Sequence, residues 1–359
     1  MSDRRHKILH DLDIAGGEGL EIGPLMWPAV TKDQGRVTYV DFTDTATLRA
    51  KYAGSTVVDP ALIVEVDAIW GEKTLAQAVG EGRQFDYVVA SHVIEHVPDL
   101  IAWLNEVAEV LKPGGQIRLV VPDKRFTFDF FRRETELSDV LNAHLLKARR
   151  PLPGLILDYC LNFVVVDMVR IWNRQDDVAQ LQRAPDWIAK ARDWARRSHE
   201  DGEYIDIHCW VFTPVGFARL MEQIVAEGLV ACRCTSFSDT AENTNEFFVG
   251  MAHEPDRAAA IESWRQMQLQ AAAGGSQGHF DLSGTLAERE KAAIRADLDR
   301  AGAELAAVRA RLAQVERDLE AARAARTDAE GRAAAMTQSR SWRYTAMLRR
   351  VSDRLGRRG

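Results

Sequence analysis

The spacing of apolar residues differs from segment to segment along the chain. Short continuous apolar runs predict buried strands, and apolar residues three or four positions apart predict helices. The clearest unit runs from Phe85 to Asp123. Within it, Asp86–Ala90 is a continuous apolar run, typical of a strand buried on both faces of a parallel sheet. Apolar residues then recur at helical spacing from Leu100 to Leu111, and Ile117–Val121 is a second apolar run. The pattern predicts one βαβ unit.

Shorter patterns on either side extend this unit into a sheet covered by helices. The other predicted strands are Leu20–Gly23, Val37–Val40, Leu62–Val66, Leu229–Phe237 and Glu246–Met251. The other predicted helices are Thr45–Tyr52, Lys73–Val79 and Thr213–Gly228. Because strands and helices alternate, the expected fold class is α/β with a doubly wound, mostly parallel sheet. Ligands of such sheets bind beyond the carboxyl ends of the strands.

A helical segment interrupts this alternation between residues 124 and 208. Its helical patterns cover Phe126–Lys147, Leu155–Trp172 and Ala184–Arg197. We predict that residues 124–208 form an insert that caps the carboxyl ends of the strands and selects the substrate. Tryptophans of the insert can stack on sugar rings, although aromatics at helical spacing more often pack in a core. They are Trp172, Trp187 and Trp194.

The C-terminal third has a different character. Residues 1–255 form the expected first domain, and 256–285 are predicted to be a linker because they contain the run AAAGGSQG. Apolar residues alternate at spacings of four and three from Ile294 to Ala322, which predicts a coiled coil over 286–338, for self-association or a partner helix. Residues 339–359 hold seven Arg and one Asp, and predict a basic amphipathic tail suited to an anionic membrane surface.

Composition and charge narrow the class of partner. The 359 residues carry a net charge of −7, which argues against nucleic acid. Four cysteines without framework spacing are typical of free thiols in a reducing cytoplasm. The N-terminus lacks the apolar core of a signal peptide, and charges within Leu152–Trp172 disfavour a membrane span. We expect a cytoplasmic protein whose tail can contact the inner face of the membrane.

One motif resembles a metal site. His92, Glu95 and His96 match H-x-x-E-H, the pattern of inverted zinc proteases. That motif requires both histidines on one turn of a helix. Here a strand is predicted to end near Ala90 and a helix to begin near Pro98, so the five residues are expected to form a loop and to bind no metal.

The unit from Phe85 to Asp123 resembles a known family. It resembles the later half of class I S-adenosylmethionine-dependent methyltransferases. In that family the same features follow one another, namely an FDxV strand, an EH pair, a helix and the sequence LKPGG. The resemblance covers about forty positions. It implies a Rossmann-like sheet of seven strands, with one of the last two antiparallel. It also implies S-adenosylmethionine as the cofactor.

The same resemblance implies where the cofactor lies. Glu21-Ile22-Gly23-Pro24-Leu25 occupies the place of the family's acidic-x-Gly-x-Gly loop, with Leu25 where the second glycine is expected. Asp41 would accept hydrogen bonds from the ribose, and Asp67 would lie near the adenine. The implied cofactor contacts are Glu21, Gly23, Pro24, Asp41, Phe42, Asp67, Ala68, Ser91 and His92.

Methyl transfer to a hydroxyl group requires an in-line approach of the acceptor and a base that removes its proton. Four titratable residues lie at predicted strand ends or in the loops that follow them. The candidate bases are His92, His96, Asp123 and His208, each with a structural role as its alternative.

The tail bears on the substrate. Ser341–Arg349 resembles an S-W-R-x-T-x-P-L-R signature of bacterial surface-polysaccharide enzymes, with Met347 in place of proline. It implies O-methylation of a glycan or a glycan precursor. The alternatives are a small-molecule or lipid methyltransferase, and a non-catalytic scaffold that recruits glycan enzymes through its coiled coil. The altered loop at Leu25 favours the scaffold, whereas Asp41 and Asp67 argue against it.

Overall fold

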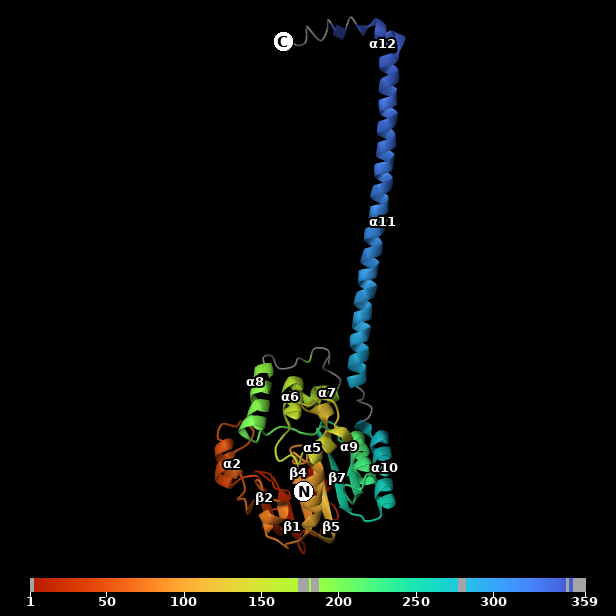
Figure 1. The fold of residues 1–359 in the computed structure, drawn as a ribbon. Helices are drawn as coiled ribbons and strands as arrows, with labels where there is room; N and C mark the ends of the chain where they lie inside the picture. The colour runs from red at the N-terminus through yellow and green to blue at the C-terminus, as the bar shows by residue number, and fades with distance from the viewer. Residues whose placement is uncertain (1–2, 174–180, 182–186, 277–281, 347–348, 351–359) are drawn as a thin grey trace. The chain divides into compact units, whose positions relative to one another are not determined.

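Seven strands form one sheet in the first part of the chain (Figure 1). The computed structural model describes residues 3–173, 181, 187–276, 282–346 and 349–350, and the chain divides into two units, Met1–Leu286 and Ala287–Gly359. The strands are β1 Glu18–Ile22, β2 Arg36–Asp41, β3 Ala68–Ile69, β4 Phe85–Ser91, β5 Leu111–Pro122, β6 Cys232–Ser238 and β7 Glu246–His253. Their order is β3-β2-β1-β4-β5-β7-β6, with β7 antiparallel to both neighbours. The predicted α/β fold with a mostly parallel sheet is confirmed.

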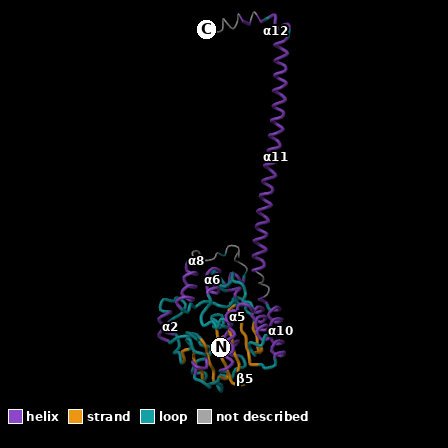
Figure 2. Tube along the Cα trace, in the orientation of Figure 1, coloured by secondary structure: helices purple, strands orange, loops and turns teal. Residues whose placement is uncertain are grey.

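Helices and loops surround these strands (Figure 2). The helices of the first unit are α1 Asp3–Leu9, α2 Thr45–Lys51, α3 Leu75–Val79, α4 Leu100–Glu109, α5 Leu137–Leu145, α6 Pro153–Asn162, α7 Met168–Trp172, α8 Trp187–Arg196, α9 Pro214–Ala226 and α10 Arg257–Ala273. Several begin at a side-chain cap. Asp99 accepts from the Ala102 N–H at the start of α4, and Thr213 accepts from the Gly216 N–H at the start of α9.

Both faces of the sheet are buried, which explains the continuous apolar run of β4. Val88 and Ala90 belong to the larger core, which also includes Trp103 of α4. Tyr87 and Val89, which point to the opposite face, belong to a second core with Ile8 of α1. Alternate residues of one strand thus contribute to two cores.

The third strand differs from the prediction. Leu62–Val66 was expected to be a strand, but Pro60–Leu62 forms a 3-10 turn and β3 is Ala68–Ile69. The apolar side chains of the segment serve a local cluster instead, in which Ile63 packs with Leu48 and Val58. The end of this strand therefore lies further along the chain than expected.

The insert is less helical than predicted. Within Phe126–Lys147 only α5 is an α-helix, and Leu155–Trp172 divides into α6 and α7. The division occurs where Phe163 takes an extended conformation and Asp167 caps α7. The predicted helix over Ala184–Arg197 is observed as α8, and residues 184–186 lie outside the described part.

The predicted boundary at residue 255 is also corrected. Residues 257–273, assigned to the linker, form α10, whose Trp264 and Met267 are buried in the larger core. Part of the predicted run AAAGGSQG is thus the end of a packed helix, and residues 277–281 lie outside the described part.

The second unit is helical where it is described. Helix α11, Leu282–Gln338, contains 57 residues, and α12 spans Arg340–Tyr344. The predicted seam residues Leu305, Leu312 and Leu319 are about half exposed in the single chain. The coiled coil remains a prediction, as does the tail, because residues 347–348 and 351–359 lie outside the described part. No helix in the described ranges is long and apolar enough to cross a bilayer.

Candidate functional site

A cavity of about 1180 Å³ lies where β1, β2 and β4 end. Gly23 follows β1, Phe42 follows β2, and Ser91 is the last residue of β4; all three line the cavity. Most binding pockets measure about 300–1,000 Å³. This cavity is therefore larger than most binding pockets and has room for a cofactor-sized ligand.

The loop after β1 keeps a glycine-like backbone despite its altered sequence. Gly23 has φ of +64° and Leu25 has φ of +49°, a region that residues other than glycine rarely adopt. Behind the loop, the buried carboxylate of Glu21 accepts the N–H groups of Ala29 at 2.6 Å and Val30 at 3.1 Å. Burial raises the pKa of Glu21 to about 7. Glu21 thus holds the loop in place through these two hydrogen bonds, and Glu21, Gly23 and Pro24 all line the cavity.

Asp41 and Phe42 lie at the end of β2 and line the cavity, as the sequence implied. One oxygen of Asp41 accepts the N–H of Phe42 at 2.7 Å. Burial raises the pKa of Asp41 to about 6. The Phe42 ring stacks with Tyr204 at 6.3 Å, and the ammonium group of Lys51 lies 4.9 Å from the Phe42 ring centre. This corner combines a carboxylate with a flat apolar surface.

Asp67 and Ala68 are not among the residues that line this cavity. The Asp67 carboxylate accepts the N–H of Tyr39 at 2.8 Å and pairs with Lys32 at 2.6 Å. Trp70 and Gly71, which follow the observed β3, line the cavity in their place. The displaced strand is the reason for the difference.

Arg4, Ser91 and His92 also line the cavity and join a series of charged groups from distant segments. His92 has φ of +54°, and its Nε2 lies 2.8 Å from Glu246 at the start of β7. Arg4 of α1 donates to Glu246 at 2.6 Å and to the hydroxyl of Ser91 at 2.9 Å. Burial would lower the pKa of His92, but its contacts with Glu246 and Glu95 raise it to about 9. Arg4 and Glu246 belong to no motif in the sequence, so they were not predicted.

Among the four candidate bases, His92 and His96 line the cavity. Asp123 is fully buried, forms an ion pair with Arg125 and accepts from the Thr240 hydroxyl at 2.7 Å. His208 is also buried, and its ring meets that of His96 edge-on at 4.7 Å. The structure thus brings three of the candidates together and leaves Asp123 apart from the cavity.

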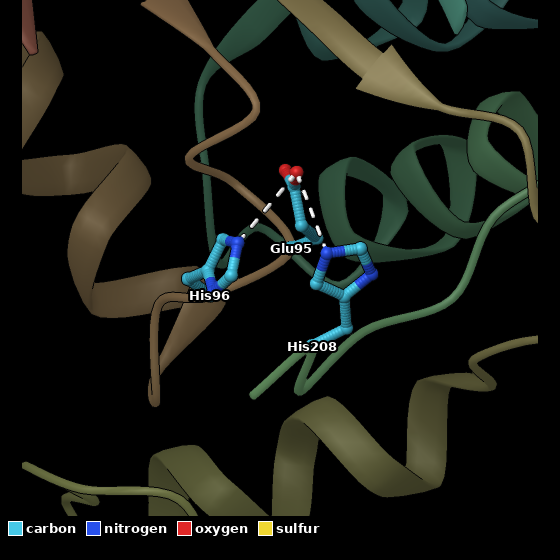
Figure 3. A group of neighbouring side chains, drawn as sticks. All are labelled: Glu95, His96 and His208. Carbon is cyan, nitrogen blue, oxygen red and sulfur yellow. Dashed lines mark ion pairs between the residues drawn. The ribbon is translucent and has the colours of Figure 1, made fainter. Parts of the chain in front are cut away.

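Glu95 lies between His96 and His208 (Figure 3), and His92 is a third histidine at ion-pair distance. Its Oε1 is 3.4 Å from His92 Nδ1, 3.9 Å from His96 Nε2 and 4.0 Å from His208 Nε2. Burial alone would raise the pKa of Glu95, but the facing imidazoles hold it below its usual value. Residues 92–96 form a loop with a turn rather than a helix, as predicted. Glu95 and His96 form the EH pair of the sequence motif, but the contact between Glu95 and His208 was not predicted.

The insert contributes another wall of the cavity. Arg149, Arg150 and Tyr204 line it. The tryptophans singled out in the sequence do not, because Trp172 stacks on Phe126 at 4.2 Å and Trp187 on Phe163 at 5.0 Å. The third, Trp194, packs against the core. Other tryptophans line the cavity instead, namely Trp27, Trp70 and Trp103.

Comparison with known proteins gives one strong similarity. Residues 12–224, more than half of the chain, match a family model described as a methyltransferase domain. No curated protein matches the chain in sequence.

Several solved structures are similar at low identity. The DhpI–SAH complex is 16% identical over 66% of this chain and 77% of that chain, with a TM-score of 0.31. The glycopeptide N-methyltransferase MtfA is 13% identical over 70% of this chain and 89% of that chain, with a TM-score of 0.33. A putative zinc-dependent alcohol dehydrogenase from Rhodobacter sphaeroides is 15% identical over 70% and 90%, with a TM-score of 0.37. These scores are too low to support an argument about ligand or substrate.

Proposed function

The chain belongs to the methyltransferase-domain family, and from this premise we propose that it transfers the methyl group of S-adenosylmethionine to an oxygen of a glycan or glycan precursor. The cofactor supplies a methyl group on a sulfonium, which is its own leaving group. The chain must therefore bind and orient two molecules and accept one proton.

The observation that carries this proposal is Asp41, a buried carboxylate at the end of β2 with its side chain in the cavity wall. A carboxylate in this position can accept the hydroxyl hydrogens of a ribose. Gly23 supports the same assignment, because it lines the cavity and has no side chain, so a ligand can lie against its backbone. We therefore place the adenosine near Asp41 and Phe42, with the methionine end toward Ser91 and His92.

Calorimetric titration with S-adenosylmethionine and S-adenosylhomocysteine tests the cofactor site. We expect micromolar binding that Asp41→Ala removes. Asp59→Ala is the matched control, because Asp59 caps a 3-10 turn and does not line the cavity. A folded protein that binds neither compound would contradict the proposal and would favour the scaffold alternative.

The acceptor is proposed to be a glycan, on the resemblance of the tail and on the size of the cavity. Arg149 and Arg150 in the cavity wall suit an acceptor that carries a phosphate or carboxylate. We infer that His92 or His96 receives the acceptor proton, since both line the cavity. The contacts that raise the pKa of His92 to about 9 require that it acts in its neutral form, so transfer through His92 should speed up as the pH rises toward 9. Labelled methyl transfer to nucleotide sugars and polysaccharide fractions tests the glycan. Labelling of small molecules or lipids alone would support the other enzymatic alternative.

The second unit is proposed to assemble the enzyme and to position it. The apolar seam of α11 would pair with a second copy or a partner helix, and the Arg-rich tail would hold a cytoplasmic protein at an anionic membrane surface. Co-sedimentation with anionic and neutral vesicles tests the tail. We expect deletion of residues 340–359 to abolish binding to the anionic vesicles, and unchanged binding would refute a membrane role.

A further inference from the structure

Glu95 is a buried carboxylate at the centre of a cluster of imidazoles. Its side chain is 0% exposed, and neither Oε1 nor Oε2 has a hydrogen-bond partner in the described part of the chain. Burial of an ionised carboxylate is strongly unfavourable unless the charge is paired or coordinates a metal. Glu95 therefore needs positive charge nearby, and three imidazoles lie at ion-pair distance from it in the described part of the chain.

The other carboxylates near the three histidines already have a cationic partner. Each of them contacts a Lys or Arg side chain at 2.6 to 2.8 Å. The pairs are Asp129 with Arg132, Asp206 with Lys51, and Glu246 with Arg4. Within the described residues, Glu95 has no Lys or Arg partner at ion-pair distance. Only imidazoles face it.

Two of these imidazoles are oriented from behind by carboxylates. His208 Nδ1 lies 2.6 Å from Asp129, and His96 Nδ1 lies 2.9 Å from Asp206, an ion-pair distance without hydrogen-bond geometry. Each ring therefore turns its Nε2 toward Glu95 (Figure 3). A carboxylate behind a histidine is the usual outer support of a metal ligand, because it sets the ring orientation and raises the basicity of the other nitrogen.

We propose that Glu95, His96 and His208 bind one divalent transition-metal ion. Their ligand atoms lie within 4.8 Å of one another. Ligands at the usual distance of about 2.0–2.1 Å from tetrahedral zinc are about 3.4 Å apart, so small side-chain movements would complete the site. Two imidazoles and a carboxylate favour Zn²⁺, Mn²⁺, Fe²⁺ or Co²⁺ over Mg²⁺ or Ca²⁺.

The site differs from the zinc pattern considered in the sequence. In the zinc pattern both histidines, here His92 and His96, lie on one helix, whereas here they lie in a loop. The second histidine ligand of the proposed site is instead His208, which lies at the end of the insert and contacts that loop. His96 lines the cavity, so an ion held by its Nε2 would lie near the edge of the cavity. If the proposed function holds, an acceptor hydroxyl bound there would lose its proton more readily. Metal binding itself does not depend on that function.

The test is titration of the full chain, purified without a polyhistidine tag and stripped by a chelator. Co²⁺ is followed by visible absorbance, and Zn²⁺ and Mn²⁺ by calorimetry. We expect one ion per chain. Glu95→Gln and His208→Gln should weaken binding by more than the roughly 10- to 100-fold typical of losing an outer-sphere partner, and Asp129→Asn should fall within that range.

His144→Gln is the matched control, because His144 also contacts a carboxylate, Asp99 at 3.1 Å, but lies outside the cluster. Circular dichroism and thermal melting show whether each variant is folded, independently of cofactor binding or methyl transfer. A folded parent protein that binds none of the three ions would overturn the proposal and assign the histidines to charge compensation. Binding that survives both ligand substitutions would overturn it equally.

Discussion

The indole N–H of Trp264 donates a hydrogen bond to the carbonyl oxygen of Cys232 at 3.0 Å, and so joins α10 to β6. Trp264 is 0% exposed and packs edge-on against Phe217 of α9 at 6.1 Å. Trp264→Ala should lower the free energy of unfolding by about 3–5 kcal/mol, through lost burial and an empty cavity. Urea denaturation of the full chain measures this change.

Trp27→Ala is the control for that substitution. Trp27 is 61% exposed, so its replacement should change the free energy of unfolding by less than about 0.5 kcal/mol. Equal losses for the two variants would mean that α10 is not part of the folded core. A chain ending at residue 255 should likewise be much less stable than one ending at residue 276.

Helix α10 also shows what the sequence pattern conceals. Its buried positions, Ala260, Trp264, Met267 and Ala271, recur at spacings of four, three and four, the spacing of a helix face. Alanines also occupy the exposed side of α10, so the sequence shows little contrast between its buried and exposed faces. The apolar face of α10 was therefore not recognised in the sequence. The βαβ unit was predictable because strand and helix patterns there are long and unbroken.

The site was predictable where it depends on strand ends. Ser91 follows from the strand pattern, because the carboxyl ends of parallel strands meet at one edge of the sheet, and Asp41 from the family resemblance; both line the cavity. Asp67 was expected near the adenine because the third strand was expected to end just before it, and it does not line the cavity. Glu95 and His208 are 113 positions apart in the sequence, so their contact depends on the path of the insert, and no local pattern predicts that path.

The affinity for S-adenosylhomocysteine should depend on pH through Asp41. Its pKa is about 6, and only the ionised carboxylate accepts both ribose hydroxyl hydrogens. Affinity should therefore rise by up to about tenfold from pH 5 to pH 7.5, as the free protein loses the proton. Calorimetry at several pH values measures this, and Asp41→Asn should bind weakly with no such rise. A rise that persists in the variant would assign the titration to another group.

The stability of the fold should depend on pH through Glu21. Its pKa is about 7 in the fold against an ordinary value of 4.5, so the folded state binds the proton more tightly than the unfolded state. This contribution to stability is fully present below pH 4.5 and is lost as the pH rises through 7, by roughly 1–3 kcal/mol. Glu21→Gln should remove that part of the pH dependence.

Urea denaturation at pH 5 and pH 8 measures the effect of Glu21. Glu18→Gln is the control on the same strand, since Glu18 is more exposed and pairs with Arg83 at 2.7 Å. We expect Glu18→Gln to keep the pH dependence of the parent protein. If the free energy of unfolding changes equally between pH 5 and pH 8 in the parent and in Glu21→Gln, the Glu21 carboxylate does not titrate in this range.

The seam of α11 should decide the oligomeric state. Leu312 and Leu319 are 58% and 49% exposed in the single chain, on a helix of 57 residues that carries apolar side chains at heptad spacing. A second helix packed on this seam would remove them from water. The double variant Leu312→Asp, Leu319→Asp should therefore be monomeric in light scattering at concentrations where the parent associates. Ala310→Asp, on the opposite side of the heptad, should associate like the parent, and a monomeric parent at all concentrations would assign the seam to a different protein.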